Sequence, residues 1–244
     1  MITILSPAKN VRFDVPEGRQ RPVFLSETEK LVEVVRSFSP WQLEGLMQVN
    51  EKLAHEVFFF YQQYEVNQKG FMALYAYSGL VYRNIGAADF DAADLSFANR
   101  HIRILSGIYG IVKPCDGILP YRLEMGCRLA VAGKENLYDF WADRLYMHVS
   151  PMQPIVNLAS EEYARAIRRY LTPHDTFIDI EFRTLYKGKY RVLPAWAKQA
   201  RGQMARFIVK NRIDQPHQLV AFDWEGYTFQ DKQSSERRYV FVRS

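Results

Sequence analysis

Three side chains suited to acid–base and anion chemistry stand together in the sequence: Tyr121, Arg122 and Glu124. An arginine can clamp an anionic substrate, a glutamate can give or take a proton, and a phenol can position a ligand, so these are candidate catalytic residues. Glycine and proline interrupt the chain just before them, where a ligand can approach the backbone, at Gly107, Gly110, Pro114, Gly117 and Pro120. The alternative is that Arg122 and Glu124 pair with each other and merely hold this loop in place.

Two further polar residues follow segments that are expected to be strands. Residues 2–5 (ITIL) form an apolar run, and Lys9 comes shortly after its end, where α/β proteins commonly place ligand contacts. A lysine that is simply solvated on its loop is the alternative. Ser160 has the hydroxyl group of a nucleophile, but it precedes Glu161 and Glu162, the acidic start typical of a helix. We therefore interpret Ser160 as an N-cap.

The positive charge of the chain is concentrated in its last quarter. Residues 1–182 hold 19 Lys and Arg against 22 Asp and Glu, whereas residues 183–244 hold 13 against 5. Between positions 183 and 212 there are nine basic residues and no acidic one. A field of one sign this dense indicates a polyanionic partner. The alternative is a basic face that acidic groups neutralise elsewhere in the fold.

The region 194–212 is predicted to form a helix with one apolar and one basic side. At 100° per residue, the cations Lys198, Arg201, Arg206 and Lys210 fall on the side opposite Met204. Such a helix can lie along a phosphate backbone or on a membrane surface. Since no exposed apolar flank accompanies the cations, nucleic acid is the favoured partner and a membrane is not expected.

The remaining pattern predicts one compact domain, residues 1–244, of mixed α/β class with a central mixed sheet flanked by helices. Capping boxes are expected at Ser26–Glu29 and at Ser39–Gln42, so two helices meet across a short connection. This is the outline of a helix-hairpin-helix, whose amides bind phosphate. Because the connection lacks the glycines that let phosphate come close, the residues alone favour a plain corner between two helices. Strands are expected at 2–5, 71–77, 102–105, 155–158, 176–186, 190–193, 219–222, 227–229 and 239–242, and helices at 26–37, from 40, at 49–64, 89–99, 137–146, 160–171 and 194–212.

Composition limits the class of protein. Hydrophobic residues make up 48% of the 244 residues and charged residues 24%, which is ordinary for a folded domain. No run approaches the ~20 apolar residues of a membrane helix and no basic leader precedes residue 5, so a cytoplasmic location is expected. Two cysteines provide no disulfide framework, and the five histidines are scattered singly, so neither a metal site nor a cofactor is expected.

Six sequence motifs follow one another along the chain: SPAK (residues 6–9), LSGIYG (105–110), YRLEMG (121–126), LYDFW (137–141), NLASEEY (157–163) and AKQARGQMARFIVKNR (197–212). In wording and order they resemble the motifs of the peroxide-stress protein YaaA family. The resemblance implies a YaaA-type fold with a helix-hairpin-helix and a basic cleft. Lys113 stands where the family usually has Arg, Cys115 and Cys127 where it has apolar residues, and Asn84-Ile85 where it has Gly-Leu.

The resemblance and the charge pattern together predict a DNA-binding protein of the peroxide stress response. Binding to double-stranded or branched DNA would depend little on base sequence and would limit iron-dependent oxidative damage. The expected phosphate contacts are Lys9, Lys113, Arg122, Lys198, Arg201, Arg206 and Lys210. The alternative is an enzyme for a phosphate-bearing or nucleotide substrate that uses Lys9, Arg122 and Glu124. A thiol peroxidase is a third reading, since Arg128 could lower the pKa of Cys127.

Overall fold

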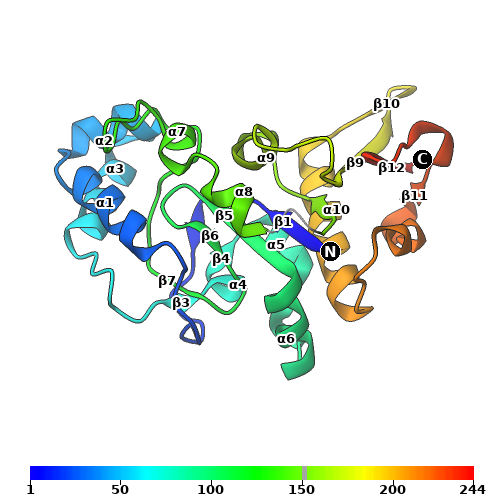
Figure 1. Ribbon diagram of the computed structural model, residues 1–244, viewed down its shortest axis with the longest axis horizontal. Helices are drawn as coiled ribbons and strands as arrows, with labels where there is room; N and C mark the ends of the chain where they lie inside the picture. Colours follow the sequence, from blue (N-terminus) through cyan, green and yellow to red (C-terminus); the bar gives the residue numbers. More distant parts are fainter. Residues whose placement is uncertain (150–152) are drawn as a thin grey trace.

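The apolar run at the start of the chain forms the central strand of the largest sheet. All four residues of β1 (Ile2–Leu5) are buried, as in a strand covered on both faces. In the computed structural model, which describes residues 1–149 and 153–244, β1 pairs in parallel with β8 on one side and with β5 on the other (Figure 1). The strand order thus reverses around β1, which makes its carboxyl end a topological switch point.

The large sheet is mixed, as the sequence predicts. Neighbouring strands are parallel from β12 through β9, β8 and β1 to β5, while β6, β10 and β11 pair antiparallel at its margins. In spatial order the strands are β11 (Thr228–Phe229), β12 (Arg238–Arg243), β9 (Phe177–Tyr186), β8 (Ile155–Asn157), β1, β5 (Ile102–Ser106) and β6 (Gly110–Val112), with β10 (Lys189–Arg191) on β9. Two small sheets join β2 (Asn10–Val11) to β4 (Tyr77–Ser78), and β3 (Phe71–Met72) to β7 (Gly117–Ile118).

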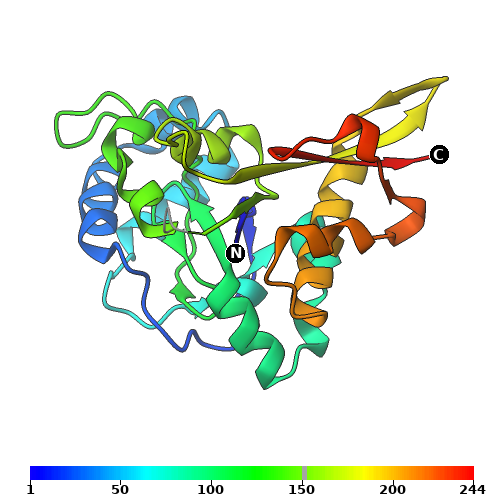
Figure 2. The ribbon, with the colours of Figure 1, turned by 45° about the vertical axis from the view of Figure 1, so that its right-hand side comes forward.

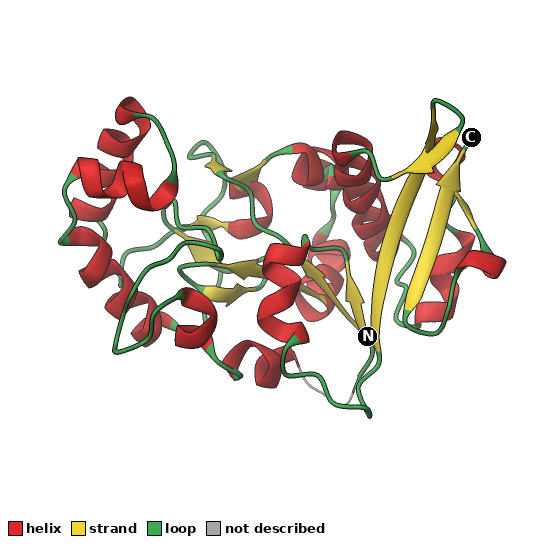
Figure 3. Cartoon of the chain, turned by 90° about the horizontal axis from the view of Figure 1, so that it is seen from above, coloured by secondary structure: helices red, strands yellow, loops and turns green. Residues whose placement is uncertain are grey.

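Helices surround the sheet in groups that Figure 3 shows from above. Helix α10 packs on α5, α6 and β9, α8 packs on α9, and α1, α2 and α3 gather at the end of the molecule away from β11 and β12 (Figure 1). The helices are α1 (Leu25–Arg36), α2 (Pro40–Met47), α3 (Glu51–Gln62), α4 (Ala73–Ala76), α5 (Leu80–Ile85), α6 (Ala92–His101), α7 (Leu137–Trp141), α8 (Arg144–Val149), α9 (Glu161–Arg168) and α10 (Pro194–Lys210), with short 3₁₀ turns at η1 (Ala87–Asp89), η2 (Pro216–Ala221), η3 (Trp224–Gly226) and η4 (Asp231–Gln233). Within the described ranges, none of them combines the length and apolarity needed to cross a membrane.

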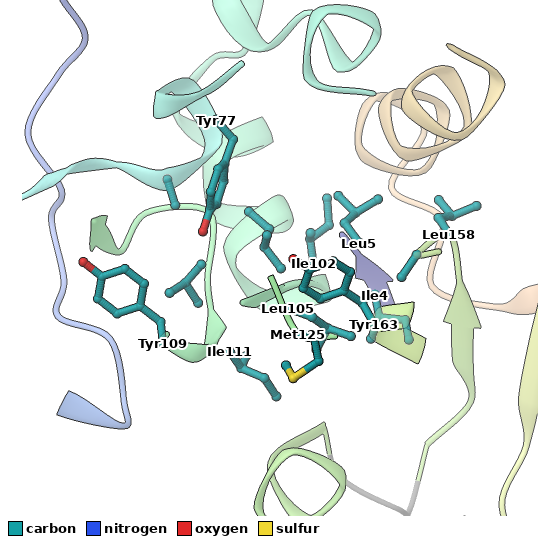
Figure 4. Packing of buried hydrophobic residues seen from close by; sticks show 14 of the residues in the cluster. Ile4, Leu5, Tyr77, Ile102, Leu105, Tyr109, Ile111, Met125, Leu158 and Tyr163 are labelled. Carbon is teal, nitrogen blue, oxygen red and sulfur yellow. The ribbon is translucent and has the colours of Figure 1, made fainter. Parts of the chain in front are cut away.

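A single apolar core connects these elements, which confirms one compact domain. It extends from Met1 to Phe241 and includes both ends of the chain. Ile4 and Leu5 of β1 lie at its centre, with Ile102 and Leu105 of β5 beside them (Figure 4).

Several local predictions are wrong, each for a local reason. The apolar segment 71–77 is no strand but β3, the helical turn α4 and β4, because short buried apolar runs do not distinguish the two periods. Of the residues 219–222, the first three belong to the 3₁₀ turn η2 that Pro216 starts, and Phe222 is its C-cap. Helix α1 begins at Leu25, so Ser26 lies inside it and caps nothing.

The second capping box is confirmed at the start of α2. The Ser39 side chain accepts from the Gln42 backbone, and the Gln42 side chain accepts from the Ser39 backbone at 2.8 Å. Helices α1 and α2 therefore meet across residues 37–39, as expected, while phosphate binding by this connection stays a prediction. The helix expected over 137–146 is instead two, α7 and α8, because Ala142 adopts a positive φ of 48° between them.

Candidate functional site

The carboxyl ends of the two parallel strands β1 and β8 are joined by a pair of serine hydroxyls. Ser6 directly follows β1, and Ser160 stands at the N-cap of α9, just after β8. The Ser160 backbone N–H donates to Ser6 Oγ at 2.8 Å, and Ser6 Oγ donates to Ser160 Oγ at 3.2 Å. Ser160 thus takes the N-cap position, but within the described part of the chain its hydroxyl makes no cap hydrogen bond. The amino terminus of α9, with its partial positive charge, faces this strand edge.

A pocket of about 420 Å³ opens at this edge, and we call it the strand-edge pocket. Its volume falls within the range of small-molecule sites. Four cations from three distant parts of the chain line it: Lys9, Arg122, Lys198 and Arg201. Two carboxylates, Glu124 and Glu162, line it as well. The pocket therefore has an excess of positive charge at the place where open α/β sheets bind ligands.

Glu124 forms the centre of the charged groups in the pocket. Its Oε1 atom lies 2.8 Å from Lys9 Nζ and 3.4 Å from Arg122 Nη2. The Glu124 side chain is 26% exposed and that of Arg122 is 14% exposed. The prediction that Lys9, Arg122 and Glu124 lie together is therefore consistent with the geometry, although the same ion pairs also hold the loop, as the alternative foresaw.

The two arginines of the pocket are not saturated by protein acceptors. In the described parts of the chain, Nε of Arg122 and Nε of Arg201 are buried without a hydrogen-bond partner. Burial lowers the pKa of the Arg201 guanidinium, an effect that Asp179 opposes. Buried donors without partners are rare in folded proteins, and they indicate that an acceptor belongs nearby.

Tyr121 lines the pocket but its hydroxyl is already engaged. The Tyr121 oxygen lies 2.7 Å from the Tyr77 hydroxyl and 2.7 Å from Ser106 Oγ. Burial raises the pKa of Tyr121 to about 12, so the phenol stays protonated at neutral pH. Among the three candidate catalytic residues, Tyr121 is thus the one most firmly built into the core.

The basic helix α10 divides into two halves with different surroundings. Lys198 and Arg201 line the strand-edge pocket. Arg206 instead pairs with Asp89 at 2.6 Å and Lys210 with Asp94 at 2.7 Å.

Asp94 is the acidic residue that neutralises the most cations at the end of α10. Its side chain is 4% exposed and also lies 2.7 Å from Arg212, and hydrogen bonding to Lys210 lowers its pKa to about 2. The structure therefore does not bring Arg206 and Lys210 to the pocket. Lys113 does not line it either; its backbone N–H donates to Asp116 in the loop before β7.

The cysteines lack the surroundings of a reactive thiol. Cys115 and Cys127 are both buried and free. Burial raises the pKa of Cys127 to about 11, opposite to the lowering that a neighbouring Arg128 was expected to produce. Across residues 1–149 and 153–244, no three His, Cys, Asp or Glu side chains lie close enough together to hold a metal ion.

The sequence did not reveal the two serines or Glu162 as parts of one site. Glu162 Oε1 accepts the Gly126 backbone N–H at 2.9 Å and so ties α9 to the YRLEMG loop. Ser6 and Ser160 are 154 positions apart and meet only because β8 pairs with β1. The available signal was that polar residues follow two buried strands. The sequence does not show that those two strands pair.

Comparison with known proteins places the chain in a family. The family model described as peroxide stress protein YaaA matches residues 1–233. A UPF0246 protein of Lactiplantibacillus plantarum is 38% identical over 245 residues, covering 99% of both chains. UPF0246 proteins of Clostridioides difficile and Maricaulis maris are 38% and 40% identical, covering all of this chain and 100% and 96% of their own. The chain belongs to the peroxide stress protein YaaA family, which supports a role in peroxide stress.

Proposed function

We propose that the protein acts in peroxide stress by binding double-stranded or branched DNA through its phosphate backbone, with little dependence on base sequence. The observation that carries this proposal is the convergence of Lys9, Arg122, Lys198 and Arg201 on one pocket. In the described chain Nε of Arg201 is buried without a hydrogen-bond acceptor, and a phosphate oxygen would supply one.

The strand edge offers further donors to a phosphate. The amino terminus of α9 and the hydroxyls of Ser6 and Ser160 lie in the same pocket as the cations. Helix amino termini at switch points commonly bind phosphate through backbone N–H groups and the helix dipole. Since these contacts address phosphate and not base edges, they favour binding that depends on salt more than on sequence.

A projecting hairpin supplies a second set of cations for an extended polyanion. The end of β9 and the short strand β10 form a hairpin that projects beyond the body of the molecule, and Lys187 and Gly188 join them (Figure 2). Lys187, Lys189 and Arg191 are exposed there, beside the half-exposed rings of Tyr186 and Tyr190. Aromatic rings among cations are typical of surfaces that contact nucleic acid. The hairpin therefore supports DNA over a small anion as the ligand.

The proposed benefit during peroxide stress is physical cover of the DNA. Hydrogen peroxide and iron generate radicals that attack sugars and bases along exposed strands. A protein that occupies the backbone without sequence preference would limit such iron-dependent damage wherever it binds. This part of the proposal rests on the family's role in peroxide stress and on the charge arrangement, and requires no metal ligand in the chain.

Fluorescence-anisotropy titrations with duplex, single-stranded and branched DNA of the same length test this proposal. Affinity for duplex or branched DNA should fall as salt rises, with little change when the base sequence is permuted. Affinity that is undetectable at low salt, or that follows the base sequence, would reject the proposal.

A small-molecule enzyme is the second candidate, and the position of Glu124 favours it. This carboxylate lies in a pocket of ligand size between Lys9 and Arg122. Arg122 would hold the phosphate of a nucleotide, Lys9 would stabilise developing negative charge, and Glu124 would transfer a proton. Phosphate release or base release from a panel of nucleotides, lost in Glu124→Gln while nucleotide binding persists, would support it. No turnover of any nucleotide in that panel by the unaltered protein would reject it.

A further inference from the structure

A second pocket, of about 310 Å³, lies beside a cluster of buried tyrosines formed by Tyr64, Tyr77, Tyr109 and Tyr121. Among the described residues that line it there is no carboxylate. We call it the tyrosine pocket. Three cations surround it: Arg19, Arg21 and Lys69. Tyr109, on its wall, packs edge to face at 5.4 Å against Tyr121, which lines the strand-edge pocket. The two pockets are therefore separate spaces that share a tyrosine wall.

The cations of the tyrosine pocket remain largely available to a ligand. Arg21 donates to the side chain and backbone oxygens of Asn67, which are neutral acceptors. Lys69 contacts Glu17 at 3.3 Å, but both side chains are mostly exposed, so this pair is weak. Arg19 forms no ion pair with a carboxylate in the described parts of the chain. The charge at this pocket is thus positive and poorly compensated.

The floor of the pocket contains a hydroxyl hydrogen without an acceptor. Tyr64 and Tyr109 share one hydrogen bond between their hydroxyls, and the Leu119 backbone N–H donates to Tyr109 at 2.8 Å. The two phenols have two hydroxyl hydrogens, and their mutual bond uses one of them. No residue within the described ranges accepts the other, although Tyr109 is only 2% exposed. A buried donor of this kind implies an acceptor in the adjoining space.

Bare backbone and apolar side chains complete the pocket. Gly18, Gly70 and Gly117 line it, and a Cβ on Gly18 would lie 2.2 Å from Gly117 Cα, so only glycine permits this close packing. Leu25 and Leu119 add an apolar wall. The space is therefore lined by apolar side chains as well as by donors and cations, a combination that suits a phosphorylated small molecule.

We infer that the tyrosine pocket is a second anion site, which binds a phosphate monoester through Arg19, Arg21 and Lys69 and a phenol hydroxyl at its floor. The shared chemistry is a dianionic phosphate, either free or attached to a nucleoside. The site is independent of DNA binding at the strand-edge pocket, because the described residues that line the two pockets are all different.

Backbone NMR of the full-length protein tests the inference, with inorganic phosphate and adenosine monophosphate as probes. The amides of Gly18, Gly70 and Gly117 should shift on titration, and the double variant Arg19→Ala/Arg21→Ala should weaken that response by about tenfold or more. Two control variants should leave the shifts of these amides unchanged. Lys52→Ala removes an exposed lysine of α3, and Lys198→Ala removes a lysine of the strand-edge pocket. Tighter binding of the nucleotide than of phosphate would show that the apolar wall is part of the site. Equal affinities would show that the site recognises the phosphate group alone.

Any one of three outcomes would overturn the second site. The first is that the signals of the glycine amides shift with neither probe, and the second is that they shift equally in the double variant. The third is that they shift with duplex DNA but with neither inorganic phosphate nor adenosine monophosphate. If the double variant does not fold, Arg21→Gln replaces it, since glutamine keeps a donor for Asn67 but no charge. DNA affinity measured on the same samples separates this inference from the proposed function, because Lys198→Ala should weaken only that affinity.

Discussion

Lys9 Nζ lies 2.8 Å from Oε1 of Glu124, so the lysine that follows β1 is already paired in a pocket that also contains three other cations. A phosphate that enters this pocket must share Lys9 with the carboxylate or displace it. Glu124 is therefore the residue at which a binding protein and an enzyme differ most clearly.

Glu124→Gln should tighten DNA binding if the pocket only binds phosphate. The substitution removes a competing negative charge while it keeps the shape, and a partly exposed ion pair is worth about 0.5–1 kcal/mol, or roughly two- to fivefold in affinity. Anisotropy titration with duplex DNA at one salt concentration measures the affinity of Glu124→Gln, and Glu162→Gln, which alters the other carboxylate of the pocket, serves for comparison. Weaker binding in Glu124→Gln would show that the carboxylate organises the cations and does not compete for them.

Gly202→Ala should destabilise the fold by about 1–3 kcal/mol. A Cβ at this position of α10 would lie 2.2 Å from the Val81 carbonyl oxygen, where α10 packs on α5. Gly45→Ala is the matched control, since Gly45 also lies inside a helix but no atom of the described residues lies within 4 Å of its Cβ position. Alanine there should stabilise the fold by about 0.5–1 kcal/mol. Urea unfolding of both variants decides the matter, and equal free energies of unfolding would contradict the close packing of the two helices.

Asp116 should make the fold less stable as pH rises from about 4 to 6. Burial raises the pKa of this carboxyl from 3.8 to about 6. Below pH 4 both folded and unfolded chains hold the proton; between the two values only the unfolded chain releases it; above pH 6 the folded chain carries the full cost of a buried charge. That cost is on the order of 2–3 kcal/mol.

Asp116→Asn isolates this contribution. Its stability relative to the unaltered protein should be near zero at pH 4 and should grow as pH rises to 7, as measured by urea unfolding at several pH values. A difference that stays constant over this range would mean that folding does not raise the pKa of Asp116.

Cys127 should react slowly with thiol reagents. With a pKa of about 11, roughly one thiol in a thousand is ionised at pH 8, and the side chain is buried. Iodoacetamide labelling followed by mass spectrometry should therefore show far slower modification of Cys127 than of a cysteine in the unfolded chain. Rapid labelling in the folded protein would reopen the thiol peroxidase reading.

Helices and strands could be predicted from the sequence where a single physical signal dominated. The apolar runs of β1 and β5, the capping box at Ser39 and the alternating β9 all lie where they were expected. The segment 71–77 failed because its residues are buried in either conformation, so only tertiary pairing of β3 with β7 decided the outcome.

The site could be predicted only in part, because the tertiary fold decides which acidic residue pairs with each cation. All residues of α10 that were expected to contact phosphate lie on one side of a helix, yet Asp89 and Asp94, more than a hundred positions earlier, neutralise Arg206 and Lys210. Sequence places a cation on a helix face but not the acid that it meets. The serine pair at the ends of β1 and β8 was hidden for the same reason.

The division of α10 provides the most direct test of the account. The salt dependence of duplex DNA affinity should be measured for Lys198→Ala and Lys210→Ala, two lysines on the same helix, of which the first lines the strand-edge pocket and the second pairs with Asp94. The account predicts that Lys198→Ala lowers affinity and reduces the slope of log affinity against log salt by about 1, while Lys210→Ala leaves the slope unchanged. An unchanged slope in Lys198→Ala, or an equal loss in both variants, would contradict phosphate binding at this pocket.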